Sequence, residues 1–252
     1  MLTTRESPPE TARLLAAVDA TWPPAETVDR GGWRLRRGAG GGKRVSAASV
    51  LGAGDGAGEI AEAEAAMRGW GQPPLFRLSE GDAGLDRDLA ARGYRVVDPV
   101  LFYAAPIGRM TGEDAHLAAV YRVEGLPAIL EEIWDAGGIG PARRAVMDRV
   151  ALPKMRLLSR AEDIPCGAAF VAIDREVAMI HAIEVLARLR RKGAARLLME
   201  GAARFAAEHG ATTLALAVAE ANVPARGLYA RLGMAEVGGY HYRIAPDATE
   251  RQ

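Results

Sequence analysis

The chain has 252 residues, 49% apolar and 25% charged, and this composition excludes disordered and fibrous classes. Lysine plus arginine and aspartate plus glutamate each number 32, so the net charge is zero and no overall field attracts nucleic acid or an anionic membrane. The single cysteine, Cys166, can form no intramolecular disulfide and no metal site alone. No apolar run approaches the roughly 18 residues of a membrane span, and the charged start is unlike a signal peptide. We therefore expect a soluble, cytoplasmic protein.

The first hundred residues contain short elements separated by glycine-rich turns. Their apolar patterns predict helices over residues 12–20, 59–68 and 85–92 and strands over 32–36, 44–51, 75–78 and 96–103. A polar stretch with glycine and proline follows at residues 106–115. The sequence therefore predicts two domains, 1–108 and 109–252.

The second half alternates helices and strands more regularly. Helices are predicted over residues 117–134, 141–150, 194–209 and a short segment after Asn222, and strands over 155–159, 167–173, 178–185, 213–218 and 238–244. The first of these helices contains Gly125 and Pro127, which we expect to break or kink it. Residues 194–209 show one small or apolar face at the helical period, and Asn222 is a typical helix cap. Helices alternating with strands indicate a mixed α/β fold.

The two halves resemble each other at an offset of 140 residues. Six identities coincide, among them Gly233 with Gly93 and Val237 with Val97, and the predicted elements follow in the same order. This pattern favours a duplication, with the first half as the more degenerate copy.

The stretch Arg190-Arg-Lys-Gly-Ala-Ala195 joins a predicted strand to the helix at 194–209. Its glycine and alanines let a ligand approach the backbone, and the first amides of a helix have no intrahelical acceptor. Such a helix N-terminus suits a pyrophosphate, and Arg190, Arg191 and Lys192 add positive charge. The alternative is a solvated basic turn without a ligand.

Two motifs in this half resemble the GNAT superfamily of N-acetyltransferases. Arg190-x-x-Gly193-x-Ala195 is similar to its acyl-CoA signature, Arg/Gln-x-x-Gly-x-Gly/Ala. Asn222-x-x-Ala225-x-x-Leu228-Tyr229-x-x-Leu232-Gly233-Met234 is similar to its downstream segment, with Met in place of Phe. The resemblance covers residues 112–246 and implies a GNAT fold, a mixed sheet with two splayed parallel strands, in tandem with the first half.

The resemblance also implies acetyl-CoA as co-substrate, held between the strands at 178–185 and 213–218. Backbone groups at Val185 would hold the pantetheine arm, and the turn would hold the pyrophosphate. The residues assigned to the cofactor are Val185, Arg190, Arg191, Lys192, Gly193, Ala194, Ala195, Arg196, Asn222 and Tyr229. The superfamily usually has glycine where Arg191 stands, a departure that removes no amide donor.

Three residues are candidates for the chemistry of an amine attacking the thioester directly. Tyr229 matches the position that often donates a proton to the departing thiolate. His181 resembles the histidine that serves as base in serotonin N-acetyltransferase, and by the strand period of two we expect it on the same face as Val185. Glu184, expected on the opposite face, is the alternative base. Tyr240 and Tyr242 are candidates for lining a substrate pocket.

The sequence is compatible with several other interpretations of its function. Residues 38–43 lack the glycine and the Ser/Thr of a phosphate loop, whereas residues 52–57 formally fit a dinucleotide fingerprint. A non-catalytic module that senses acyl-CoA is the main alternative to an acetyltransferase. Nucleic-acid binding through residues 188–192 conflicts with the zero net charge, and the histidines show no metal-ligand spacing. The acceptor is an amine on a small molecule or peptide, and homodimerisation stays open.

Overall fold

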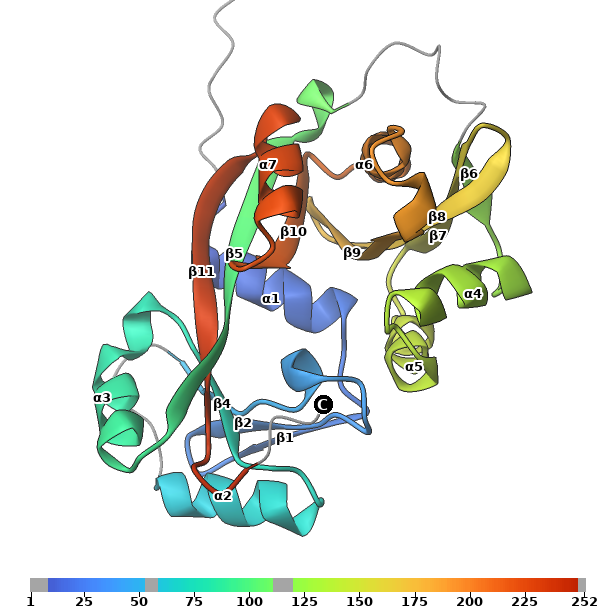
Figure 1. Cartoon of the computed structure of the whole chain (residues 1–252). Coiled ribbons are helices and arrows are strands. Elements are labelled where there is room, and N and C mark those ends of the chain that lie inside the picture. The colour runs from blue at the N-terminus through green and yellow to red at the C-terminus, as the bar shows by residue number, and fades with distance from the viewer. Residues whose placement is uncertain (1–8, 53–58, 111–119, 249–252) are drawn as a thin grey trace, which may run out of the picture.

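The computed structural model describes residues 9–52, 59–110 and 120–248, and Figure 1 shows the whole chain. The α-helices are α1 (Thr11–Thr21), α2 (Ile60–Gly69), α3 (Ala83–Ala91), α4 (Ala128–Ala136), α5 (Pro141–Arg149), α6 (Ala194–Glu208) and α7 (Val223–Arg231). The strands are β1 (Glu26–Arg30), β2 (Trp33–Arg37), β3 (Ser49–Val50), β4 (Leu75–Leu78), β5 (Arg95–Pro106), β6 (Val120–Val123), β7 (Lys154–Ala161), β8 (Ile164–Asp174), β9 (Val177–Val185), β10 (Thr213–Ala219) and β11 (Ala235–Ile244).

Among the described residues, eight strands form one sheet that runs through both halves of the chain. Its order is β4-β11-β5-β10-β9-β8-β7-β6, and only β9 and β10 are parallel neighbours. Strands β1, β2 and β3 form a second, smaller sheet in the N-terminal half. The fold is thus mixed α/β, as the sequence predicts.

The centre of the large sheet exchanges strands between the two halves. Strand β5, from the N-terminal half, lies between β10 and β11 of the C-terminal half. Strand β11 in turn lies between β4 and β5. In Figure 1 the long green β5 and red β11 cross the middle of the molecule side by side. Each half therefore receives from the other the strand that completes its part of the sheet.

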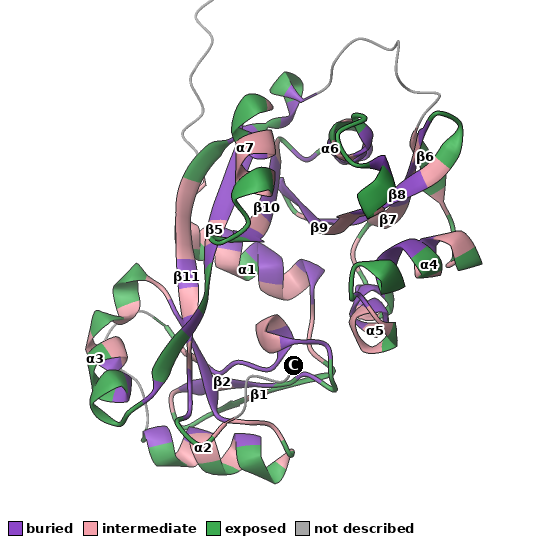
Figure 2. Ribbon diagram, in the orientation of Figure 1, coloured by how far each residue is buried: buried purple, intermediate pink, exposed green. Residues whose placement is uncertain are grey.

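Helices cover both faces of the sheet, so its central strands are buried on both sides (Figure 2). Helix α6 packs against β7, β8 and β9 on one face, while α1 and α4 pack against β8 and β9 on the other. A strand buried on both faces needs apolar side chains at every position. The pattern of β8 from Cys166 to Ile173 meets this need, because every side chain there is buried.

Helix α1 is bound to the N-terminal strands through one half-buried carboxylate. Asp19 accepts hydrogen bonds from Arg36 on β2, at 2.6 Å, and from Arg77 on β4, at 2.7 Å and 2.9 Å. Burial raises the pKa of Asp19, but the two guanidinium groups outweigh it and hold that pKa below its usual value. Because α1 also packs on β8 and β9, this cluster holds the two halves together.

Most predicted elements are confirmed, and two predictions are wrong. The predicted strand over residues 44–51 is instead a 3₁₀ turn (Lys43–Val45) followed by the two-residue strand β3. The predicted helix over 117–134 begins only at α4, because Pro127 starts it, and the residues before Gly125 form strand β6. The glycine-rich residues 53–58 and residues 111–115 of the predicted linker lie outside the described residues.

The described part of the chain contains no helix that is both long and apolar enough to cross a membrane. It also contains no group of three or more His, Cys, Asp or Glu side chains placed to hold a metal ion.

The exchanged strands predict that neither half folds alone. Expressed separately, residues 115–252 lack β5 and leave β10 and β11 without their shared neighbour, so we expect aggregated or unfolded protein. Co-expression with residues 1–114 should restore the native circular dichroism spectrum and a cooperative melt. The control is the intact chain cleaved at the same position after folding, which keeps both pieces together. Cooperative unfolding of residues 115–252 alone would contradict this prediction.

Candidate functional site: a gap between two parallel strands

Strands β9 and β10 are paired over only part of their length. Their three residue pairs end at Met179 and Ala215, yet β9 continues to Val185 and β10 to Ala219. Strand β10 stays paired with β5 as far as Ala219, so it diverges from β9 without losing its other neighbour. The result is a wedge-shaped opening, lined by the edge of β9 that β10 no longer pairs, while the other edge of β9 stays paired with β8.

The N-terminus of α6 follows β9 and presents free backbone amides. Gly193 takes a left-handed conformation, with φ of 87°, and directs the chain into the helix without a side-chain cap. The first intrahelical bond runs from the amide of Leu197 to the carbonyl of Gly193. Within the described residues the amides of 193–196 have no hydrogen-bond acceptor, and the first turn has no acidic side chain. These donors and the helix dipole form a site for an anion.

The basic side chains of this turn mainly hold the protein's own groups. Arg190 donates from Nε to the carbonyl of Val185 and from Nη2 to Glu184, both at 3.0 Å. Lys192 pairs with Glu162 at 2.7 Å, and Arg196 with Glu200 at 2.6 Å. Arg191 has a φ of +68°, which explains why glycine is usual at this position in the superfamily that the motif resembles. The free amides, rather than these side chains, are the donors left for a ligand.

The backbone of Val185 is occupied by its neighbours. Its amide donates to Glu184 Oε1 at 3.1 Å, and its carbonyl accepts from Arg190. Glu184 and Arg190 are themselves ion-paired. An arriving ligand that used the Val185 backbone would have to replace these contacts.

A β-bulge in β9 decides which way the candidate bases point. Two residues, Ala182 and Ile183, oppose a single residue of β8, and Ala182 has a φ of +51°. The bulge breaks the period of two. His181 and Glu184 therefore lie together on the face covered by α1 and α4, while Val185 packs on the α6 face. The prediction that His181 shares a face with Val185, opposite Glu184, is thus wrong.

The contacts of His181 fix its tautomer. Thr21 Oγ1 donates to the carbonyl of Ala17, so it accepts from His181 Nε2 at 2.9 Å. The other nitrogen, Nδ1, then accepts from Arg44 Nη1 at 3.3 Å. Burial, followed by the charge of Arg44, lowers the pKa of His181 well below its ordinary value. Because its basic nitrogen already faces a cation, the geometry favours a neutral, positioning histidine over the predicted base.

Tyr229 lies on α7 and packs against both diverging strands. It joins the apolar cluster that includes Ile180 of β9 and Val218 of β10, and its ring centroid is 5.8 Å from that of Tyr103. Burial raises the pKa of Tyr229 to about 12, so the phenol keeps its proton at physiological pH. In the described chain its hydroxyl has no hydrogen-bond partner. It is a proton or hydrogen-bond donor available to a group in the gap.

Asn222 caps α7, as the sequence predicts. Its side-chain oxygen accepts from the amide of Ala225 at 3.3 Å.

A cavity of about 370 Å³ adjoins the open end of the gap. Ala182 of β9 and Ala219 of β10, both beyond the last β9–β10 pair, form part of its wall. The other lining residues come from both halves: Trp22, Gly41, Gly42, Lys43, Arg44, Asp98, Val100, Ile139, Arg143, Tyr240 and Tyr242. The tyrosines were candidates from the sequence, whereas Trp22, Arg44 and Arg143 were missed. Their only signal was the basic end of the glycine-rich segment at residues 38–44.

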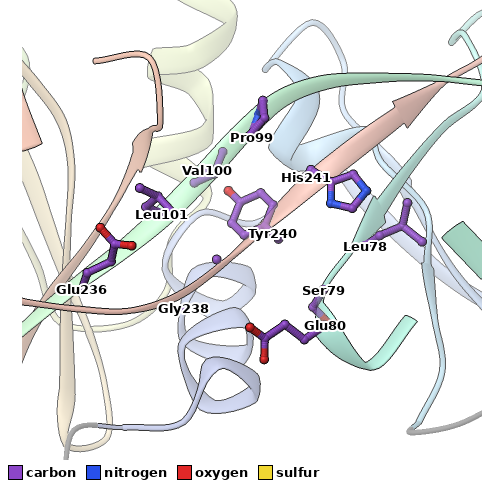
Figure 3. Close-up of a pocket in the computed structure, with 11 residues that line it drawn as sticks. Leu78, Ser79, Glu80, Pro99, Val100, Leu101, Glu236, Gly238, Tyr240 and His241 are labelled. Carbon is purple, nitrogen blue, oxygen red and sulfur yellow. The ribbon is translucent and has the colours of Figure 1, made fainter. Parts of the chain in front are cut away.

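A second cavity, of about 380 Å³, lies where β4 ends beside β5 and β11. Figure 3 shows Glu80 and Glu236 at its edge and Tyr240 at its centre. Its histidine, His241, is held by Asp86 at 2.8 Å. With two carboxylates and no Lys or Arg among its lining residues, this cavity differs in charge from the first.

Comparisons with known proteins agree with this geometry. The model of the acetyltransferase (GNAT) family matches residues 140–234, which include α6, α7 and the diverging strands. An uncharacterised N-acetyltransferase of Bacillus subtilis, YobR, is 25% identical over 236 residues, covering 89% of this chain and 94% of that protein. A GCN5-related N-acetyltransferase from Kribbella flavida has a TM-score of 0.71 at 20% identity, covering 94% and 96% of the two chains.

A tandem GNAT protein from the clavulanic acid biosynthesis pathway also matches in structure. Its TM-score is 0.59 at 16% identity, over 98% of this chain and 92% of that one. This likeness extends over both halves and supports a two-domain architecture. Taken together, the family match over residues 140–234 and these likenesses support membership of the GNAT superfamily and indicate an acetyltransferase enzyme.

Proposed function

We propose that the C-terminal half transfers an acetyl group from acetyl-CoA to an amine that attacks the thioester directly. The observation that carries this proposal is the free amides of residues 193–196 beside the opening between β9 and β10. An anion at the helix N-terminus and an extended arm between the strands together match the shape and charge of acyl-CoA. The cavity that adjoins the opening leaves room for the acceptor.

In this proposal backbone groups bind the cofactor and Tyr229 acts on the thioester sulfur. The amides of Arg191 and residues 193–196 hold the pyrophosphate, and the Val185 backbone binds the pantetheine arm once Glu184 and Arg190 yield their contacts. Tyr229 donates to the sulfur as negative charge develops there. A phenol with a pKa of about 12 transfers its proton uphill to a thiolate, so a strong hydrogen bond is its main contribution.

We assign His181 to positioning rather than to proton removal. It holds Arg44 through Nδ1 and is itself held by Thr21. Glu184 is the other candidate base, but its carboxylate is bound to Arg190 and to the Val185 amide. The proton of the amine is then released to solvent in the cavity.

We also propose that the N-terminal half is a GNAT-like repeat that does not bind CoA. Helices α3 and α7 differ in position by 140 residues at both ends, and β5 and β11 begin at the same offset. The acidic second cavity lies beside the end of β4, the counterpart of β10 under this offset. Carboxylates there are unsuited to phosphate groups.

Consumption of acetyl-CoA in the presence of a panel of amines tests the activity. Transfer to at least one amine supports the proposal. Tight acetyl-CoA binding without turnover on any amine would contradict it and leave the sensing module as the better function.

Substitution at the two ends of α6 tests the anion site. Gly193 and Gly210 both have positive φ and open space where a side chain would begin, so Gly193→Glu and Gly210→Glu introduce the same strain and charge. Only Gly193→Glu brings a carboxylate to the free amides, and we expect it to weaken acetyl-CoA binding at least tenfold. Calorimetry should show one site in wild type and in Gly210→Glu. Equal affinities in both variants would contradict the assignment.

Removing one hydroxyl tests the donor. Tyr229→Phe should lower kcat by about 10²–10⁴-fold and leave acetyl-CoA affinity nearly unchanged, because the charge it stabilises develops only during reaction. Tyr103→Phe deletes a neighbouring hydroxyl that is bound to Glu236, and it should keep wild-type turnover. Full activity of Tyr229→Phe would remove the tyrosine from the mechanism.

The pH dependence of stability tests the positioning role of His181. Its folded pKa is depressed, so below a pH of about 6.5 the unfolded state binds more protons and wild type loses about 1.4 kcal/mol per pH unit through this group. His181→Gln should therefore be less destabilising at pH 5 than at pH 7.5 in thermal melts, with His209→Gln at an exposed position as the control substitution. A base role predicts instead that His181→Gln removes the acidic limb of the rate profile.

A further inference from the structure

The cavity at the open end of the gap holds more positive charge than its own carboxylate balances. Lys43, Arg44 and Arg143 line it, against the single carboxylate of Asp98. Asp98 is already paired with Lys43 at 2.7 Å. Arg44 and Arg143 have no ion pair within the described residues, so the cavity carries two uncompensated cations.

Arg44 contacts two neighbouring side chains, but one of its hydrogen-bond donors has no acceptor. One of its Nη atoms contacts His181, its guanidinium lies 6.0 Å from the centre of the Trp22 ring, and its buried Nε has no hydrogen-bond partner. The phenols of Tyr240 and Tyr242 offset the effect of burial and keep the pKa of Arg44 above its usual value, so it is charged. A half-buried cation without a counter-charge is unfavourable, which is a reason to expect an anion beside it.

Arg143 approaches the same cavity from the opposite half. Its side chain extends from α5 to Gly42, where an added Cβ would lie 3.4 Å from the Nε of Arg143. No hydrogen bond or ion pair involves its side chain in the part of the chain that the structure describes. Two guanidinium groups from different halves thus meet at one cavity, each with donors to spare.

The remaining walls are aromatic, aliphatic or small. Trp22 and Tyr242 are almost fully buried, and the buried hydroxyl of Tyr240 has no hydrogen-bond partner. Ala182 and Ala219 leave the end at the strand gap free of bulky groups. The cavity therefore offers cations, an aromatic wall and a passage to the thioester site.

We propose that the acceptor carries, besides its amine, an anionic group, a carboxylate or a phosphate, that Arg44 and Arg143 bind. This inference rests on the proposed acetyl transfer and names the class of its acceptor. The anion fixes one end of the molecule between the two guanidinium groups, and the amine extends toward the gap between β9 and β10.

Matched amines test the acceptor class. Aromatic and aliphatic amino acids are compared with their carboxamides, and aminoalkyl phosphates with the corresponding amino alcohols, in an assay of CoA release. We expect at least tenfold higher kcat/KM for the anionic member of each reactive pair. If the kcat/KM ratio of charged to neutral amine is larger in the amino acid series, the anionic group is a carboxylate; if it is larger in the aminoalkyl phosphate series, the group is a phosphate. Either result supports the proposal. Equal kcat/KM values for the anionic and the neutral amine of each pair would overturn it.

The variant Arg143→Gln tests the residue. It should raise KM for the anionic amine about ten- to hundredfold, change kcat little, and abolish the preference over the neutral twin. Arg175→Gln removes the same charge from an exposed turn and is the matched control. Loss of acetyl-CoA affinity in Arg143→Gln would place the residue in the CoA site and overturn the proposal.

Binding without turnover separates this inference from the proposed function. N-acetylated amino acids and N-acetylated aminoalkyl phosphates are titrated calorimetrically into wild type and Arg143→Gln in the absence of CoA. Binding of either to wild type but not to the variant supports the anion site even if no acetyl transfer is found. Binding of neither, in a protein that acetylates neutral amines, would leave the activity established and the anion site refuted.

Discussion

The antiparallel pairing of β5 with β10 is the interaction on which the candidate site depends. Strand β10 has seven residue pairs with β5 and only three with β9. A strand with a complete partner on one edge can leave its other neighbour without exposing more than one row of backbone groups. The gap is therefore stable because the N-terminal half supplies β5, and the family match over residues 140–234 does not contain that strand.

Contacts between the halves continue from the sheet into the cavity. Asp19 binds α1 to β2 and β4, and the end of the same helix supplies Thr21 and Trp22. Thr21 orients His181, and His181 contacts Arg44 of the N-terminal half. Helix α1 and these side chains thus connect the ion cluster at Asp19 to the cavity at the open end of the gap. Under the proposed function, a change in the N-terminal half alters acceptor binding without touching the turn at residues 190–195.

The sequence predicts the local elements of this protein better than its long-range pairing. Helix α6, the cap at Asn222 and the glycine turn at Gly193 follow from periodicity and backbone preference, and all are confirmed. No local pattern reveals that β5 pairs with β10, since that contact joins segments more than a hundred residues apart. The bulge at Ala182 is also hidden, because alanine carries no preference for positive φ. The extra residue at this bulge reverses the faces expected from a regular strand for the side chains that follow it.

The exchange of strands has a consequence for how the protein is made. During synthesis β5 leaves the ribosome about 130 residues before β11, its partner on one edge, and β4 leaves earlier still. At about 5–20 residues per second the edge of β5 that pairs with β11 is without its partner for roughly 6–26 seconds, and that of β4 for longer. Unpaired edges attract other chains, so the nascent N-terminal half has a period of vulnerability that a self-contained domain would avoid. Chaperone supply over that interval should therefore influence the yield of folded protein.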